Sequence, residues 1–250
     1  MIEININAGV AVMTMAYGKA NALDLEFCAA LVAEFGKLKN SDAHAVILTG
    51  QAKIFSAGVD LRRLSDGGAD YIRKFLPALH RLYDAVFFHP KPIVCAINGH
   101  AIAGGAVLAS CGDRRIMARD AGRIGITELQ VGVPFPMLAF EIVRSMAPPR
   151  YLAEFTLGAS TYASDVGLLK GWVDEVVEPS ELVPRALVVA QQYAAISPPA
   201  YAQAKKQLRD PVRERLERTG EATDKAVTEI WTAPPTLAYI RDYVARTLKK

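Results

Sequence analysis

Cysteine is scarce in this 250-residue sequence, and its three cysteines show neither a disulfide framework nor a metal-binding spacing. Cys95 and Cys111 lie in apolar runs, where cysteine is usually a small buried hydrophobe. No apolar run approaches the roughly 20 residues of a membrane-spanning helix. Residues 1–6 alternate in polarity and lack the basic start and apolar block of a signal peptide. We therefore expect a cytoplasmic protein with no metal, no structural disulfide and no membrane partner.

An excess of charge of one sign is also missing. The chain has 29 Lys and Arg against 26 Asp and Glu, a formal net charge of +3. This excess is small and evenly spread, so it predicts no nucleic-acid partner. Basic and acidic residues alternate over 205–221, which is typical of a solvated helix face. The hydrophobic fraction of 51% is ample for a buried core.

The hydrophobic periodicity predicts an α/β fold that becomes purely helical near residue 195. We divide the chain into a mixed core, 1–195, and a helical C-terminal region, 196–250. Alternation over 2–15 predicts a hairpin, and Asp24 can cap a helix that reaches residue 40. The other expected strands are 45–50, 92–97, 115–118 and 172–177. The other expected helices are 71–88 with a kink at Pro77, 181–195, 198–208, 212–231 and 235–248.

Three segments combine small residues with groups that could carry chemistry. The first, 54–61, is a loop in which Gly58 lets a ligand approach the backbone closely. In the second, 98–108, a glycine pair at Gly104 opens a helix, whose first N–H groups form an anion site. The third, 124–134, places Glu128 among apolar residues, where desolvation would raise its pKa toward that of a general base.

In this order and spacing, the three segments resemble the crotonase superfamily of enoyl-CoA hydratases and isomerases. The resemblance covers nearly the whole chain and implies a ββα spiral core with a helical C-terminal extension. It implies that the backbone N–H groups of Val59 and Gly104 form an oxyanion hole for a thioester carbonyl, with Glu128 as the catalytic acid and base. The residues that it implies for binding acyl-CoA are Lys19, Ala20, Ala22, Ala57, Gly58, Asp60, Leu61 and Thr127.

One departure from the family separates two reactions. Hydratases of the family carry a second catalytic glutamate three residues after the second oxyanion donor, and here that position is Val107. Valine cannot handle a proton, and we expect its side chain to help exclude water from the site. The segments 103–108 and 125–128 look most like those of monofunctional isomerases, which move a double bond from the 3- to the 2-position with one base. The sequence therefore favours an enoyl-CoA isomerase.

Two alternatives remain open, an enoyl-CoA hydratase or other one-base enzyme of this type, and a non-catalytic RNA-binding relative. The RNA-binding relatives have a lysine-rich first helix, whereas the helix expected here carries only Lys37 and Lys39, near its end. No cofactor is expected, because coenzyme A is part of the substrate. The resemblance also implies a homotrimer or a dimer of trimers, in which the helical tail packs on neighbouring subunits. The last helix also has an apolar stripe that needs a partner surface, formed by Leu237, Ile240, Tyr243, Val244 and Leu248.

Overall fold

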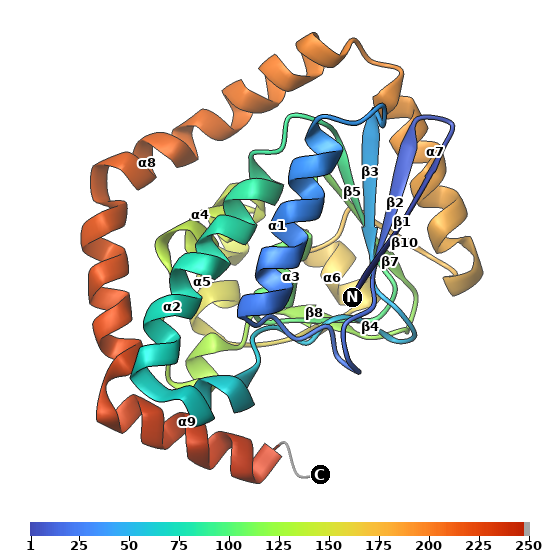
Figure 1. Cartoon of the computed structure of the whole chain (residues 1–250). Coiled ribbons are helices and arrows are strands. Elements are labelled where there is room, and N and C mark those ends of the chain that lie inside the picture. The colour runs from blue at the N-terminus through green and yellow to red at the C-terminus, as the bar shows by residue number, and fades with distance from the viewer. Residues whose placement is uncertain (248–250) are drawn as a thin grey trace.

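Two β-sheets, one large and one small, form the centre of the molecule (Figure 1). The computed structural model describes residues 1–247. In spatial order, the large sheet holds β1 (Ile2–Asn7), β2 (Val10–Met15), β3 (Ala45–Thr49), β5 (Ile93–Ile97), β7 (Arg114–Ala118) and β10 (Glu175–Val177). The small sheet holds β4 (Ile54–Ser56), β6 (His100–Ile102), β8 (Arg123–Gly125) and β9 (Tyr162–Ala163). Only the pairs β1–β2 and β8–β9 are antiparallel among the described strands.

The chain passes repeatedly from the large sheet to the small sheet and then into a helix. β3 and β4 lead into α2 (Leu61–Phe87), and β5 and β6 lead into α3 (Gly104–Ser110). β7 and β8 lead into the 3₁₀ turn η1 (Glu128–Val131). This alternation confirms the α/β fold with a ββα core. Because β4, β6 and β8 are parallel neighbours, the loops that follow them meet at one edge of the small sheet.

Strand alternation decides which layer each side chain enters. Along β3, Val46 and Leu48 face the main core, whereas Ala45 and Ile47 face α7 (Leu182–Ala194) on the opposite side of the sheet. All of these strand residues are buried, so β3 is covered on both faces. This double burial explains why the strand is a continuous apolar run instead of an alternating one.

The first half of the chain follows the predicted elements with one correction. The hairpin over 2–15 is present, and α1 (Leu25–Lys39) is capped by Asp24, whose carboxylate accepts a hydrogen bond of 2.8 Å from the N–H of Phe27. The helix expected from 71 begins ten residues earlier, because Asp60 caps its start. Non-helical backbone lies at Gly68 (φ 58°, ψ −151°), which the periodicity did not predict, and Pro77 lies further along the same helix.

The middle of the chain contains elements that the periodicity did not predict. Short strands and helices fill the stretch between β7 and β10, for which the sequence analysis named no element. They are β8 and β9, with η1, α4 (Met137–Met146), α5 (Pro149–Leu157) and α6 (Ser164–Lys170). The strand expected over 172–177 is reduced to β10.

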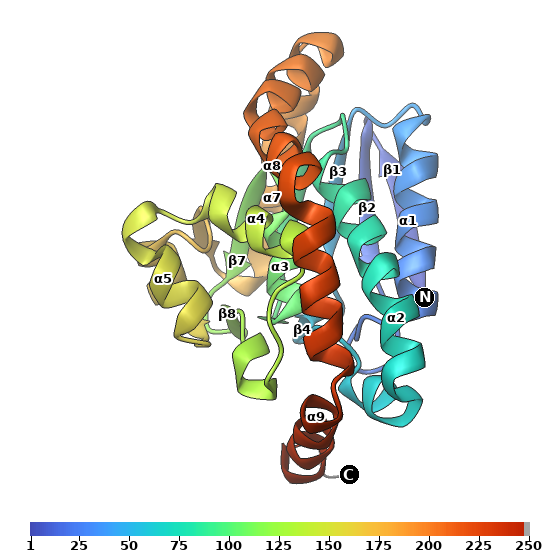
Figure 2. The same ribbon diagram turned by 90° about the vertical axis from the view of Figure 1, so that its left-hand side faces the viewer.

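Two long C-terminal helices pack on the core of their own chain. α8 (Pro198–Thr232) runs past α2 and α4 toward α9 (Pro234–Thr247), as Figure 2 shows. The expected interruption near Pro211 is absent, because Arg209 and Val212 are both buried and hold this part of α8 against the core. None of the described helices is both long and apolar enough to cross a bilayer.

One expectation for this region was wrong. The solvated face predicted over 205–221 begins with buried residues, since Lys205 and Arg209 both form ion pairs with Asp113. Contact of the last helix with a neighbouring subunit stays a prediction, and part of its apolar stripe faces its own chain. Ile240 is completely buried, and α9 packs on α2 of the same chain. Leu248 lies outside the described residues.

Candidate active site

The loop that follows β4 is held by the segment around Asn21. The Asn21 amide donates hydrogen bonds of 3.1 Å to the carbonyl oxygens of Met15 and Phe55. The N–H of Leu23 donates to the carbonyl oxygen of Gly58 at 2.8 Å. These bonds bring Ala20 and Ala22 alongside residues 57–60, and the resemblance implies both groups for the acyl-CoA site and its oxyanion hole.

The loop that follows β6 approaches the first loop most closely at two glycines. A Cβ atom on Gly58, where φ is +86°, would lie 2.6 Å from the carbonyl oxygen of Ile102 and 3.1 Å from the Gly104 nitrogen. A Cβ atom on Gly105 would lie 2.3 Å from the carbonyl oxygen of Ser56. Only glycine fits these positions, and its absence of a side chain lets the two loops touch.

This contact brings the two predicted oxyanion donors together. Val59 lies directly after Gly58, and a Cβ on Gly104 would be 3.5 Å from Cγ1 of Val59. Gly104 is also the first residue of α3, where an N–H has no acceptor within the helix. Within residues 1–247, neither the Val59 N–H nor the Gly104 N–H donates to a protein acceptor. Both donors line the same cavity.

Glu128 follows β8 as the first residue of η1 and lies in the same cavity. Its side chain is buried, and its Oε2 atom has no hydrogen-bond partner within the described residues. Burial raises the pKa of Glu128 to about 7, although the backbone N–H groups of Glu128 and Thr127 act in the opposite direction. A carboxyl group with this pKa can accept and return a proton near neutral pH.

The cavity has a volume of about 570 Å³. Of the predicted site residues, it is lined by Ala20, Ala22, Ala57, Val59, Asp60, Leu61, Gly104, Thr127 and Glu128. Lys19 and Gly58 are not among the lining residues. Lys19 is exposed beside Ala20, and Gly58 is buried between Ala57 and Val59. The structure therefore gathers most of the predicted residues around one space.

Part of the cavity wall escaped the sequence analysis. Tyr83 on α2, Trp231 on α8, and Tyr243 and Thr247 on α9 all line it. Aromatic residues at helical spacing are usually core residues, and nothing in their local sequence marks these as lining a site. The lining by α8 and α9 shows that the C-terminal region completes the cavity of its own chain.

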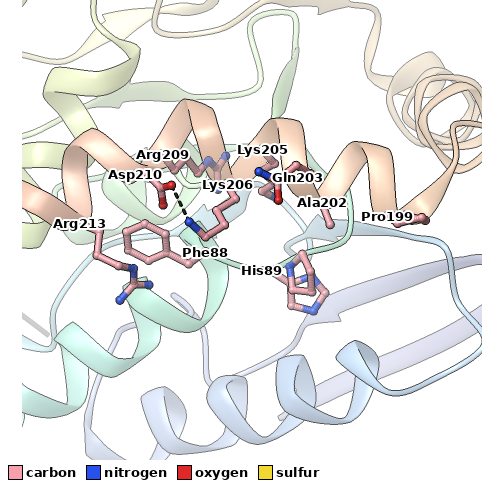
Figure 3. Close-up of a pocket in the computed structure, with 11 residues that line it drawn as sticks. Phe88, His89, Pro199, Ala202, Gln203, Lys205, Lys206, Arg209, Asp210 and Arg213 are labelled. Atoms are coloured by element: carbon pink, nitrogen blue, oxygen red, sulfur yellow. Dashed lines mark hydrogen bonds and ion pairs between the residues drawn. The ribbon is translucent and has the colours of Figure 1, made fainter.

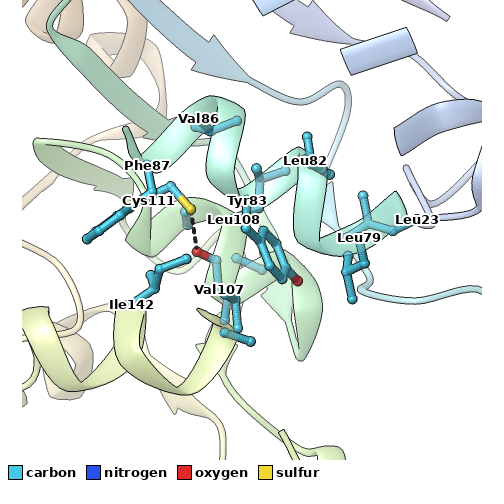
Figure 4. Close-up of a cluster of buried hydrophobic side chains, with 14 of the residues drawn as sticks. Leu23, Leu79, Leu82, Tyr83, Val86, Phe87, Val107, Leu108, Cys111 and Ile142 are labelled. Atoms are coloured by element: carbon cyan, nitrogen blue, oxygen red, sulfur yellow. Dashed lines mark hydrogen bonds between the residues drawn. The ribbon is translucent and has the colours of Figure 1, made fainter. Parts of the chain in front are cut away.

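Val107 has a different place from the one expected. It is completely buried in the hydrophobic core and does not line the cavity. Figure 4 shows it in a cluster that includes Tyr83, Leu108 and Ile142. Its side chain is therefore part of the packing behind the cavity and forms no water-excluding wall. Position 107 still has no side-chain group that can accept or donate a proton.

A second hollow, of about 380 Å³, runs along α8 on another part of the surface (Figure 3). Its cations already have anionic partners, as Lys206 pairs with Asp210 at 2.6 Å and Arg213 with Asp84 at 3.5 Å. None of the predicted site residues lines it. Within residues 1–247, no group of three or more His, Cys, Asp or Glu side chains could hold a metal ion.

Two convergent backbone donors and a buried carboxyl group are typical of an enzyme that stabilises a negative oxygen while it moves a proton. Residues 5–233 match the family of enoyl-CoA hydratases and isomerases. The chain belongs to this family, which the resemblance of its motifs had indicated. It is thus an enzyme of the enoyl-CoA hydratase/isomerase type with a crotonase fold.

Similar proteins carry both activity names. The chain is 32% identical to a putative enoyl-CoA hydratase of Thermus thermophilus over 184 residues, which cover 72% of each chain. It is 30% identical to the human mitochondrial enoyl-CoA delta isomerase 1 over 219 residues, 86% of this chain and 72% of the relative.

Similar solved structures also carry both activity names. The crystal structure of human mitochondrial delta3-delta2-enoyl-CoA isomerase matches with a TM-score of 0.93 and 27% identity, over 98% of this chain and 97% of that chain. The probable enoyl-CoA hydratase EchA3 of Mycobacterium tuberculosis matches with a TM-score of 0.81 and 30% identity, over 97% and 99%. The comparisons therefore leave isomerase and hydratase unresolved.

Proposed function

We propose that this enzyme moves a double bond of an acyl-CoA thioester from the 3- to the 2-position. The observation that carries the proposal is that Glu128 alone supplies an available carboxyl group in the cavity. The only other carboxylate among the described lining residues, Asp60, accepts hydrogen bonds of 3.0 Å from the N–H groups of Arg62 and Arg63 as the cap of α2. One base is sufficient for isomerisation, whereas hydration needs groups that position and split a water molecule.

The reaction needs only the groups described. The Glu128 carboxylate removes a proton from C2, and the electrons of the C–H bond move into the thioester as an enolate. The N–H groups of Val59 and Gly104 stabilise the negative thioester oxygen. Electrons then return from the enolate to form the C2–C3 double bond, the C3–C4 double bond opens, and C4 takes the proton back from Glu128. Protons and electrons balance without a cofactor.

We propose that the remaining predicted residues bind the substrate. Ala20 and Ala22 would contact the adenine side of CoA, with the exposed Lys19 near its phosphates. Ala57, Gly58, Asp60, Leu61 and Thr127 would contact the acyl-CoA near the thioester. The position of most of these residues around one cavity supports this assignment.

An enoyl-CoA hydratase is the second candidate, because relatives at similar identity carry that name. Tyr83 and Thr127 also line the cavity, and each carries a hydroxyl group of a kind that can accept a hydrogen bond from a water molecule. Hydration would then proceed without a glutamate at position 107.

Assays of a 3-enoyl-CoA and a 2-enoyl-CoA, side by side, test the proposal. We expect isomerisation to exceed hydration by at least about tenfold in kcat/KM, which corresponds to about 1.4 kcal/mol. Faster hydration of the 2-enoyl-CoA would refute the isomerase and favour the hydratase.

We also propose a cytoplasmic homotrimer or dimer of trimers. Support comes from exposed apolar side chains such as Leu157 on α5 and Leu169 on α6, which are 73% and 70% exposed. Sedimentation at micromolar concentration tests the assembly, and a single monomeric species would contradict it.

A further inference from the structure

Tyr83 connects the long helix α2 with the start of α3. Its side chain is 1% exposed, and its hydroxyl group donates a hydrogen bond of 3.0 Å to the carbonyl oxygen of Gly104. The same residue lines the cavity that contains Glu128. This hydrogen bond fixes the residue whose N–H is the proposed oxyanion donor.

The peptide group before Gly104 has an unusual orientation. Ala103 has φ 51° and ψ −125°, a conformation that costs about 1–3 kcal/mol for a residue with a Cβ. It is held there because its N–H donates to the Gly125 carbonyl oxygen and its own carbonyl oxygen accepts from the Ala106 N–H, both at 2.8 Å. The Ala103 carbonyl points into α3, so the N–H of Gly104, on the other side of the trans peptide, points out of the helix.

The peptide group after Gly104 belongs to the first turn of α3. Glycine has the freest backbone of all residues, and α3 is only seven residues long. A side chain at Gly104 would not fit, because its Cβ would lie 2.9 Å from the Tyr83 hydroxyl oxygen. Tyr83 occupies that space and restrains the carbonyl instead. Burial, and next the charge of Glu128, raise the pKa of Tyr83 well above its usual range, so the hydroxyl stays a donor.

We propose that Tyr83 is a positioning residue, which holds Gly104 so that its N–H stays directed at the substrate oxygen. This inference rests on the proposed function. Tyr83 acts from behind the oxyanion hole and is given no role in proton transfer. Its loss should weaken stabilisation of the enolate more than it weakens binding of the acyl-CoA.

The test removes one oxygen atom by Tyr83→Phe, with Tyr71→Phe as the matched control. Tyr71 is on the same helix and its hydroxyl also forms a hydrogen bond, with the N–H of Leu25 at 3.3 Å, but it does not line the cavity. Loss of a whole oxyanion donor costs about 10²–10³ in kcat. For a loosened donor we expect Tyr83→Phe to lower kcat by roughly tenfold or more, with KM changed by less than about threefold. Tyr71→Phe should leave both within about twofold.

A spectroscopic measurement separates this role from a structural one. A cinnamoyl-CoA chromophore shifts to the red when hydrogen bonds polarise its thioester carbonyl. We expect the shift on binding to be smaller in Tyr83→Phe than in wild type and unchanged in Tyr71→Phe. A full shift and unchanged kcat in Tyr83→Phe would overturn the positioning role. A wild-type enzyme that binds the chromophore without any shift would instead refute the oxyanion hole of the proposed function.

A second variant covers the case in which Tyr83→Phe does not fold. Replacement of Tyr83 by 3-fluorotyrosine keeps the ring and makes the hydroxyl a stronger donor. We expect an increased red shift, and an unchanged one would contradict the inference.

Discussion

The indole N–H of Trp231 donates a hydrogen bond of 2.8 Å to the carbonyl oxygen of Pro134. This bond joins the end of α8 to the segment that follows Glu128, and Trp231 is 1% exposed where it lines the cavity. The C-terminal region and the segment that carries the base are thus held together at the wall of the site.

We expect Trp231→Phe to lower the free energy of unfolding by about 2–4 kcal/mol, because it combines a lost hydrogen bond with a small cavity. Trp172→Phe is the matched control, since Trp172 is also fully buried but its indole N–H has no partner within residues 1–247. This control should lose less stability. Urea unfolding of both variants measures the difference, and equal losses would show that the bond to Pro134 contributes nothing.

Glu128→Gln should remove most turnover and leave acyl-CoA binding nearly intact. The oxyanion hole is made of backbone and survives the substitution, but an amide cannot accept the C2 proton. In the wild type, kcat/KM should rise with pH through an apparent pKa of about 7, as burial holds the carboxyl protonated below that value. A variant that retains kcat within about tenfold would remove Glu128 from the mechanism.

The same substitution should stabilise the folded protein at neutral and alkaline pH. The pKa of Glu128 is raised in the folded state from 4.5 to about 7, so the wild type loses stability as pH rises through this window. Glutamine does not titrate and avoids the loss. We expect the Tm of Glu128→Gln to exceed that of the wild type at pH 8, with the gap closing toward pH 4.5. A gap independent of pH would show that burial of the charge is not its cause.

Val107→Glu should destabilise the enzyme without making it an efficient hydratase. Val107 is fully buried among apolar side chains and does not line the cavity, so a carboxylate there has no partner. An uncompensated buried charge costs about 3–5 kcal/mol. Val107→Gln is the control of equal size, and the difference in Tm between the two variants should widen as pH rises. A stable Val107→Glu enzyme with increased hydration would show that residue 107 reaches the substrate.

Ala103→Gly should raise stability and keep the enzyme active. Glycine adopts a positive φ at no steric cost, so the substitution removes a backbone strain of about 1–3 kcal/mol. Glycine also gives the unfolded chain more conformational entropy, which lowers the free energy of unfolding by about 0.4–1 kcal/mol. Thermal unfolding should therefore show a higher Tm for the variant. A lower Tm would mean that the Ala103 methyl group, which faces Gly58, contributes more by packing than its backbone conformation costs.

The strongly periodic elements were predictable from the sequence. β3 is apolar because both of its faces are covered, and Asp24 caps α1 by a local hydrogen bond. Short elements were not, because β8 and β9 gain their stability from neighbours far along the chain. The non-helical backbone of α2 at Gly68 was not predicted either, because a glycine inside a helical pattern does not show which φ it adopts.

Prediction of the site was also uneven. Residues 57–61, Gly104 and Glu128 were found because the order and spacing of the three segments that hold them resemble those of the crotonase superfamily. Tyr83 and Trp231 are ordinary aromatic residues on apolar helix faces, and only the folded chain shows that they border the cavity. For Val107 the sequence misled in the other direction. Its position suggested a residue of the site, whereas its side chain lies in the hydrophobic core.

The cavity is bordered by residues from Ala20 to Thr247, so nearly the full length of the described chain encloses it. During synthesis on the ribosome, the segments that hold Val59, Gly104 and Glu128 emerge well before α8 and α9. Leu79 and Tyr83 line the cavity from α2, which α8 and α9 contact in the folded chain, so this side of the cavity lacks that cover until the two helices dock. In the nascent chain, the future active site is therefore an exposed apolar surface for a time. Such a surface can bind chaperones or aggregate with other incomplete chains.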